Sequence, residues 1–386
     1  MKFLRCALGA LGLFSLAATL GLRAADGDWQ VVRVEGRDYL PVDNLAKFYG
    51  FPNPVPAASQ IMPASPMEPL TKRLLLDNSR QQIELTLNSR EIVINGVRQW
   101  LAFPIVVQDD KLLISRLDLA KAVEPNLRPE MITGMGPVKT VVLDPGHGGH
   151  DKGATSIFGS EKDFALDVCQ RAKTMLEAKG LQVVMTRTSD VFIPLEQRPA
   201  VANRIPGSIF VAVHFNDALS NPLASGFEIY SITPRGAPST ADANLSTRDL
   251  RNEPGNSVEV QSLALSMSIY HSMLGNIPEF DRGIKHARFA VIRLSTVPAV
   301  LIEGGFVSSS DEARLIATPA WRQKLAEAIV TGLENYKALA EHRVPPKTVA
   351  DYRRTSPTDV ASQQAPIVVT NANAQQPAAA DAPKTP

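Results

Sequence analysis

The chain has 386 residues, with 40 Lys and Arg against 39 Asp and Glu, which gives a formal net charge of +1. This length suits two or three domains, and the balanced charge excludes a strongly basic protein that binds nucleic acid through its phosphates. The 2 cysteines are Cys6 and Cys169. Because Cys6 lies in the amino-terminal segment considered next, an internal disulfide is not expected in a processed chain.

Residues 1–25 have the layout of a secretory signal peptide. Lys2 and Arg5 precede an apolar run over residues 6–22, and Ala24 and Ala25 offer a small-residue cleavage site. The alternative, an uncleaved membrane anchor, is less favoured because this run is shorter than the roughly 20 residues of a spanning helix. No later segment is long and apolar enough to span a bilayer. The pattern predicts export to the periplasm or cell envelope.

Residues 26–133 contain an internal repeat. The segment EGRDYLPVDNLAKFYG (35–50) aligns without gaps on DDKLLISRLDLAKAVE (109–124), and each copy predicts a short strand followed by a helix from about Leu45 or Leu119. Alternating segments with an Asn95-Gly96 turn signal lie between the copies. We predict a small α+β accessory module. It resembles the N-terminal domain of copper amine oxidases, which recurs as an accessory domain on exported bacterial cell-wall enzymes. The resemblance implies adhesion or positioning at the wall, and the alternative is a packing or regulatory appendage.

Residues 138–340 alternate between strand and helix patterns. Strands are expected at 139–144, 181–187, 209–214, 226–232, 289–294 and 299–303, and helices at 161–180, 194–205, 260–274 and 320–336. This alternation predicts an α/β domain with a mostly parallel sheet of about six strands and helices on both faces. The polar stretch 233–257 predicts a long loop. The Pro-, Ala- and Gln-rich residues 345–386 predict a disordered tail.

Three residues able to bind metal or move protons follow strand patterns directly. His147 follows the strand TVVLD after a two-residue turn, His214 ends IFVAVH and Glu303 ends AVLIE. Ligands gather at the carboxyl ends of strands in open α/β sheets, so these side chains are expected to meet at one edge. Two imidazoles suit zinc, which takes three protein ligands and keeps an open position in catalytic sites.

The third ligand is left open by spacing alone. Asp144, Asp151, Glu161 and Asp163 all lie near the first histidine in sequence. Asp144 is at least as well placed to cap the glycine-rich turn, and Glu161 starts a helix at the site. Glu303 can then take a proton from water and pass it to a leaving amine; the alternative is a capping or ion-paired acid.

Other chemistries fit this loop less well. The sequence GHGG offers backbone N–H groups to an anion, but it matches neither phosphate-binding glycine motif. A serine or cysteine nucleophile is disfavoured because no G-x-S-x-G occurs and Cys169 falls inside a predicted helix. His150 is a neighbour of the site without an assigned role. Metal-assisted hydrolysis is the best reading of the residues.

Six motifs in order over roughly 139–336 resemble the zinc-dependent N-acetylmuramoyl-L-alanine amidases of the family-3 type. They are LDPGHGGHDKGA, EKDFALDV, MTRTSD, LEQRPAVAN, VHFN and PAVLIEGGFVSSSDEARLI. The resemblance implies three zinc ligands, which are His147, Glu161 and His214. It also implies Glu303 as the catalytic acid/base and supporting or substrate-binding roles for Arg187 and Asn216. The implied reaction separates the glycan from the stem peptide of peptidoglycan.

Alternatives to this reading remain open. A zinc peptidase that cuts within the stem peptide, or a non-catalytic wall-binding protein on the same scaffold, would carry similar motifs. In some relatives a helix inserted near 233–257 blocks the site until a protein activator removes it, and Asp249, Glu253 or Glu259 would then reach the zinc. A plain loop is favoured here because Pro254 and the following Gly-Asn interrupt any helix.

Overall fold

The computed structural model describes residues 29–65, 68–217, 221, 224–349 and 351–352. The predicted signal peptide therefore lies outside the described residues, as does the tail from residue 353. Val349 and Tyr352 are buried, so the packed chain continues past the expected start of the tail at 345. Within the ranges given, none of the helices combines the length and apolar character needed to cross a membrane.

The two sequence repeats form strand–helix units that face each other. Strands β1 Val32–Val34, β2 Arg37–Pro41, β9 Lys111–Ser115 and β8 Val106–Gln108 make a sheet in that spatial order. Leu40 pairs with Ile114, and these two residues occupy equivalent places in the repeats. The units are therefore related by a local two-fold axis. Their helices begin earlier than expected, with α1 at Val42–Tyr49 and α2 at Arg116–Asp118.

The second repeat helix is irregular. A π-helical segment Leu119–Val123 follows α2 and leads into α3 Glu124–Leu127. Short 3₁₀ turns lie at Ala58–Gln60 and Pro129–Met131. The apolar side chains of these helices pack on the strands of this part of the chain and form a core of their own.

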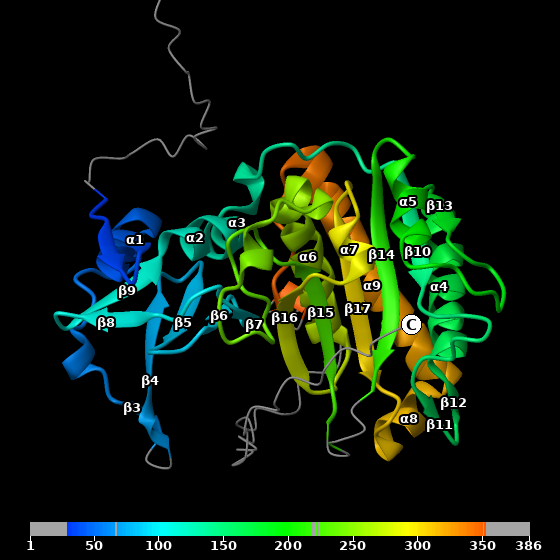
Figure 1. The fold of residues 1–386 in the computed structure, drawn as a ribbon, viewed down its shortest axis with the longest axis horizontal. Coiled ribbons are helices and arrows are strands. Elements are labelled where there is room, and N and C mark those ends of the chain that lie inside the picture. Colours follow the sequence, from blue (N-terminus) through cyan, green and yellow to red (C-terminus); the bar gives the residue numbers. More distant parts are fainter. Residues whose placement is uncertain (1–28, 66–67, 218–220, 222–223, 350, 353–386) are drawn as a thin grey trace, which may run out of the picture.

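One mixed sheet runs through both parts of the chain (Figure 1). Its 11 strands are, in spatial order, β13 Gln182–Met185, β10 Thr140–Pro145, β14 Ser208–Asn216, β17 Ala299–Phe306, β15 Phe227–Ile232, β16 Asp281–Ala287, β7 Val97–Trp100, β6 Glu91–Ile94, β5 Gln82–Thr86, β4 Glu68–Asp77 and β3 Pro63–Ser65. The first four run parallel to one another. Strand β15 is antiparallel to β17, and β16 follows the direction of β15.

Helices cover both faces of the β13–β16 half of this sheet. The long helices α4 Glu161–Ala178, α6 Glu259–Asn276 and α9 Pro319–His342 pack on one face and enclose the larger core. The short helices α5 Gln197–Asn203 and α7 Ala290–Arg293 pack on the other face. Alternate strand residues point to opposite faces, so Val141 and Leu143 enter the first core and Val142 the second.

Two elements differ from the sequence prediction. The segment 289–294, expected as a strand, contains α7, whose Val291 and Ile292 are buried against the sheet. The strand in this region is instead β16, where polar residues and Gly283 at a φ of +83° obscure the apolar alternation. A four-residue apolar run fits a short buried helix as well as a strand, and tertiary packing decides between them.

The amino-terminal part is joined to the rest by more than chain connectivity. Strand β7 pairs with β16 through Gln99 and Ile284. The long stretch 233–258 contains 3₁₀ turns at Thr247–Leu250 and Pro254–Val258 as its regular elements. It packs against the four-stranded sheet β1-β2-β9-β8. Arg90 donates to the carbonyl oxygens of Pro238, Ser239 and Asp242 in this stretch. The predicted accessory module and the α/β part therefore share a sheet and a core contact.

Candidate active site and metal-ligand cluster

The carboxyl ends of β10, β14 and β17 meet at one edge of the sheet. His214 of β14 and Glu303 of β17 are direct cross-strand partners. The loop that carries His147 leaves β10 beside them, because Gly146 N–H donates to Val213 O at 2.9 Å. The structure thus brings together the three residues that follow strand patterns in the sequence.

The glycine-rich loop turns sharply so that the His147 ring faces His214. His147 itself has a left-handed φ of +58°, and the next two glycines also have positive φ. The two imidazole ring centroids lie 5.0 Å apart. A Cβ added to Gly146 would lie 2.3 Å from Cε1 of His214, so this position has no room for a side chain. The glycines let the backbone pass close to the second imidazole.

Glu161 is the first residue of α4 and is only 4 % exposed. Its carboxylate accepts hydrogen bonds from the backbone N–H groups of Ala154 at 2.8 Å and Phe215 at 3.0 Å. Its Oε1 lies 3.0 Å from Nε2 of His147 and 2.9 Å from Nδ1 of His214. Burial alone would raise the pKa of this carboxyl, but contact with the two imidazoles outweighs burial and lowers the pKa.

These three side chains fit a tetrahedral metal site. One ligand atom from each of His147, Glu161 and His214 lies within 4.8 Å of the other two. An ion with bonds of about 2.0 Å holds tetrahedral ligands about 3.3 Å apart, close to the contacts described above. Asp151 Oδ2 lies 2.8 Å from Nδ1 of His147, which leaves Nε2 facing Glu161 in the cluster. Metal-binding histidines commonly have such a carboxylate partner.

The alternative carboxylates take other roles. Asp151 contacts His147 rather than serving as the third ligand. Burial lowers the pKa of His147, but contacts with Glu161 and Asp151 outweigh burial and raise it. Asp144 is fully buried and pairs with Arg198 at 3.0 Å. Asp163 accepts a hydrogen bond from the hydroxyl of Ser160, the N-cap residue of α4, and this hydroxyl accepts no hydrogen bond from a backbone N–H of the helix. Of the four carboxylates that the sequence left open, Glu161 contacts both histidines.

Glu303 lies beside the cluster without a partner for one of its oxygens. Its Oε2 is buried and has no hydrogen-bond partner within the described part of the chain. Burial raises the pKa of Glu303 well above its ordinary value, and the nearby carboxylates of Glu161 and Glu228 raise it further. Such a carboxyl can hold or release a proton at the site.

Arg187 supports the loop from below. It is 3 % exposed and donates to the carbonyl oxygens of Pro145 at 3.0 Å, Gly146 at 2.7 Å and Lys162 at 2.7 Å. Burial, followed by the neighbouring Arg198, lowers its pKa. The nitrogens of Arg187 therefore donate to backbone carbonyl oxygens of the loop and of α4. This favours a supporting role over contact with substrate.

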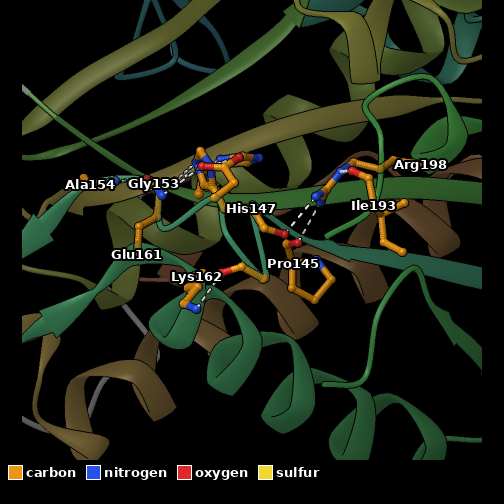
Figure 2. A network of polar contacts seen from close by, with 12 residues as sticks. Pro145, His147, Gly153, Ala154, Glu161, Lys162, Ile193 and Arg198 are labelled. Carbon is orange, nitrogen blue, oxygen red and sulfur yellow. Dashed lines mark hydrogen bonds and ion pairs between the residues drawn. The ribbon is translucent and has the colours of Figure 1, made fainter. Parts of the chain in front are cut away.

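Arg198 is a second buried arginine, which the sequence analysis did not single out. Its guanidinium donates to Asp144 Oδ1 and to three carbonyl oxygens, including that of His147 at 2.8 Å (Figure 2). Its position in LEQRPAVAN, at the start of α5, was the available signal. Two arginines therefore fix the path of the loop.

Asn216 ends β14 and faces a residue that the sequence analysis also missed. Its Nδ2 donates to Glu228 Oε1 at 3.1 Å. Glu228 is 3 % exposed and lies in β15 next to Glu303. A charged residue inside the predicted strand GFEIYSI was the signal for it.

The other candidate residues from the sequence analysis have contacts outside the metal-ligand cluster. The ring of His150 lies against Phe192, with centroids 4.4 Å apart. The carboxylates considered as blocking groups are each paired with a cation elsewhere: Asp249 with Arg288, Glu253 with Arg293 and Glu259 with Lys121. The favoured interpretation of 233–257 as a plain loop agrees with these contacts.

Comparison with known proteins supports an assignment. Residues 141–335 match the family Amidase_3, described as N-acetylmuramoyl-L-alanine amidase. Over 245 residues the chain is 31% identical to N-acetylmuramoyl-L-alanine amidase AmiA of Escherichia coli K12, which covers 58% of this chain and 84% of that protein. It is 33% identical to AmiC of Escherichia coli O6:H1 over 51% of this chain and 52% of that protein. An amidase structure from Clostridium difficile 630 is 31% identical, with a TM-score of 0.44, and covers 52% of this chain and 97% of that one.

Proposed function

The chain belongs to the Amidase_3 family of N-acetylmuramoyl-L-alanine amidases and is a peptidoglycan amidase, and we propose that it works with one zinc ion and one acid/base carboxyl. His147, Glu161 and His214 would hold the ion, and Glu303 would move the proton. The bond cleaved joins the lactyl group of N-acetylmuramic acid to L-alanine.

The convergence of three unlike chain segments on one point supports this proposal most directly. A loop histidine, the first residue of a helix and a strand-end histidine place their ligand atoms within 4.8 Å of one another. Glu303 is the cross-strand neighbour of His214. A carboxyl beside a three-ligand cluster is the arrangement that metal-assisted amide hydrolysis requires.

The protein residues have separate tasks in this reaction. Zinc, when bound, supplies a Lewis acid for the scissile carbonyl and lowers the pKa of a water toward about 7. Glu303 takes a proton from the attacking water through its unpaired oxygen and delivers it to the nitrogen of L-alanine as the amide bond breaks. Arg187 and Arg198 keep the His147 loop in place during these steps, and Asn216 holds the end of β14.

The place of action follows from the substrate. Peptidoglycan lies outside the cytoplasmic membrane, and the signal-peptide pattern of residues 1–25 supports export to the envelope. The amino-terminal module shares a sheet and a core contact with the catalytic part. These contacts support a packing role for that module, which does not prevent it from also contacting the wall.

Digestion of purified peptidoglycan by the mature protein alone tests the proposal. Intact stem peptides with free L-alanine amino groups are the expected products, and turnover should disappear with a chelator and return with zinc. Glu303→Gln should keep its zinc and lose about 10²-fold or more in kcat. Glu334→Gln, which alters an exposed acid paired with Lys179, is the control that should keep wild-type turnover.

Three results would contradict the proposal. Shortened stem peptides would indicate a peptidase, and turnover by Glu303→Gln at the control rate would exclude its role as the acid/base. Absence of any turnover in the zinc-loaded wild type would favour a binding protein, or a need for a protein activator, over an enzyme that works alone.

A further inference from the structure

Glu228 lies directly beside the proposed acid/base. It is the antiparallel cross-strand partner of Glu303, so both side chains are on the same face of the sheet. Only 3 % of Glu228 is exposed. Two adjacent carboxylates at a catalytic edge are costly unless each has its own partners.

Glu228 has a full set of partners. Its carboxylate receives the hydroxyl of Tyr230 at 2.8 Å, the amide of Asn216 at 3.1 Å and the Nε of Arg282 at 2.9 Å. The ammonium of Lys285 also donates to it. Burial raises the pKa of Glu228, but the charges of Lys285 and Arg282 outweigh burial and hold this pKa below its ordinary value.

Glu303 receives none of these donors. Its Oε2 lacks a hydrogen-bond partner throughout the described residues, although it is buried. Lys285 nevertheless lies near enough for its charge to act on Glu303. The distribution is therefore uneven, because one carboxylate binds both cations and the other faces the site without one.

The two cations differ in what else holds them. Arg282 also donates to the carbonyl oxygen of Ser225 at 3.2 Å and lies 4.9 Å from the centre of the Phe306 ring. Glu228 is the anionic partner of both cations, but the Lys285 ammonium donates to no other acceptor in the part of the chain that the structure describes. If Glu228 lost its charge, Lys285 would be the cation free to move.

We propose that Glu228 is a positioning residue that binds Lys285 and thereby keeps this cation from pairing with Glu303. The inference rests on the proposed role of Glu303. An ion pair between Lys285 and Glu303 would occupy the oxygen that takes the proton and would hold the carboxyl away from the attacking water. Glu228 has no contact with the reacting atoms in this account, and it acts through the residue that does.

The neighbouring aromatic rings limit where Lys285 can go. Its ammonium lies 5.6 Å from the centre of the Trp100 ring of β7 and 5.9 Å from that of Tyr230. Trp100 belongs to the amino-terminal module, so the module forms one wall around this cation. Glu303 is the cross-strand neighbour of Glu228 and already feels the charge of Lys285, so it is the anion that we expect Lys285 to approach.

The test uses two variants of the full mature enzyme on purified peptidoglycan. Glu228→Gln removes the charge and should lower kcat by about tenfold to a hundredfold, with KM within about twofold and zinc content unchanged. Glu228→Gln/Lys285→Met also removes the mobile cation and should recover kcat to within about fivefold of the wild type. A crystal structure of the single variant should show Lys285 in contact with Glu303.

A matched control is Asp167→Asn, because Asp167 is also a carboxylate bound by two cations, here Arg171 and Arg322, but lies between α4 and α9. It should leave kcat unchanged. Wild-type kcat in Glu228→Gln, or a double variant no more active than the single one, would overturn the inference. If the single variant does not fold, the double variant decides alone, since an inactive, folded, zinc-loaded double variant refutes the role. Glu303→Gln is assayed in parallel, and its retention of turnover would refute the proposed function instead.

Discussion

Replacing Arg198 with methionine should destabilise the protein strongly. The guanidinium is 2 % exposed, and its salt bridge to the fully buried Asp144 measures 3.0 Å. It also donates to the carbonyl oxygens of Ile193, Pro145 and His147 at 2.8 to 2.9 Å. Methionine has a similar length and no donor, so the change leaves a buried carboxylate and three carbonyl groups with fewer partners.

The expected loss follows from the buried charge. Removing one partner of a buried ion pair costs about 3–5 kcal/mol because the other charge remains desolvated. The carbonyl groups add less than their separate values, since these interactions share one side chain and are not additive. With a denaturant slope of about 3 kcal/mol per molar urea, the unfolding midpoint should fall by about 1–2 M. Arg198→Lys keeps the charge but cannot reach all four acceptors, so its loss should be smaller.

Urea unfolding followed by tryptophan fluorescence measures this loss. The control is Lys179→Met, which removes a cation from the exposed pair with Glu334. Exposed pairs contribute about 0–1 kcal/mol, so its midpoint should stay close to that of the wild type. A midpoint for Arg198→Met that equals that of Lys179→Met would refute the conclusion that this arginine holds the His147 loop.

Three further predictions concern the metal-ligand cluster. Gly146→Ala should displace the His214 ring, lower kcat by about 10²-fold and lower the bound zinc content. Gly136→Ala, where an added Cβ meets nothing within 4 Å, should match the wild type in both kcat and zinc content. Asp151→Asn should weaken zinc affinity about 10–100-fold by loosening His147, and an unchanged affinity in a competition titration would exclude this role. Removing zinc with a chelator should lower the midpoint of thermal unfolding, because ligand binding stabilises the folded state. A midpoint that does not depend on zinc would contradict a zinc site formed by the folded protein.

Part of the candidate site could be predicted because strand ends have a fixed place in an α/β sheet. His147, His214 and Glu303 each follow a recognisable strand, so topology alone placed them at one edge. Sequence spacing could not choose the third ligand among four nearby carboxylates. The family resemblance pointed to Glu161, and the structure brings that side chain into contact with both histidines.

The residues that sequence reasoning missed are buried charges whose partners are distant in the chain. Glu228 is paired with Arg282 and Lys285, more than fifty positions away, and Arg198 with Asp144. Nothing in the local pattern around a charged residue reveals such a partner. The same limit explains β16, whose polar residues are satisfied by tertiary contacts and whose strand pattern is therefore weak.

The fold class was predicted more closely than the relation between its parts. The sequence indicated a mostly parallel sheet of about six strands with helices on both faces. The structure has that covering, but its sheet is mixed and has 11 strands, because the amino-terminal strands extend it beyond β16. The predicted boundary near residue 133 does separate two cores, but it did not reveal that the two parts share one sheet. The pairing of Gln99 with Ile284 was not predictable, because it joins two strands nearly two hundred positions apart.

That pairing has a consequence for how the chain can be divided. A catalytic fragment cut after the amino-terminal module would expose the free backbone N–H and C=O groups of β16, and such a strand readily pairs with other molecules. We therefore expect the fragment to aggregate or to form unintended dimers unless β7 is retained or replaced. On this expectation the module would also keep the enzyme soluble by covering β16, which is a role independent of any ligand that it binds.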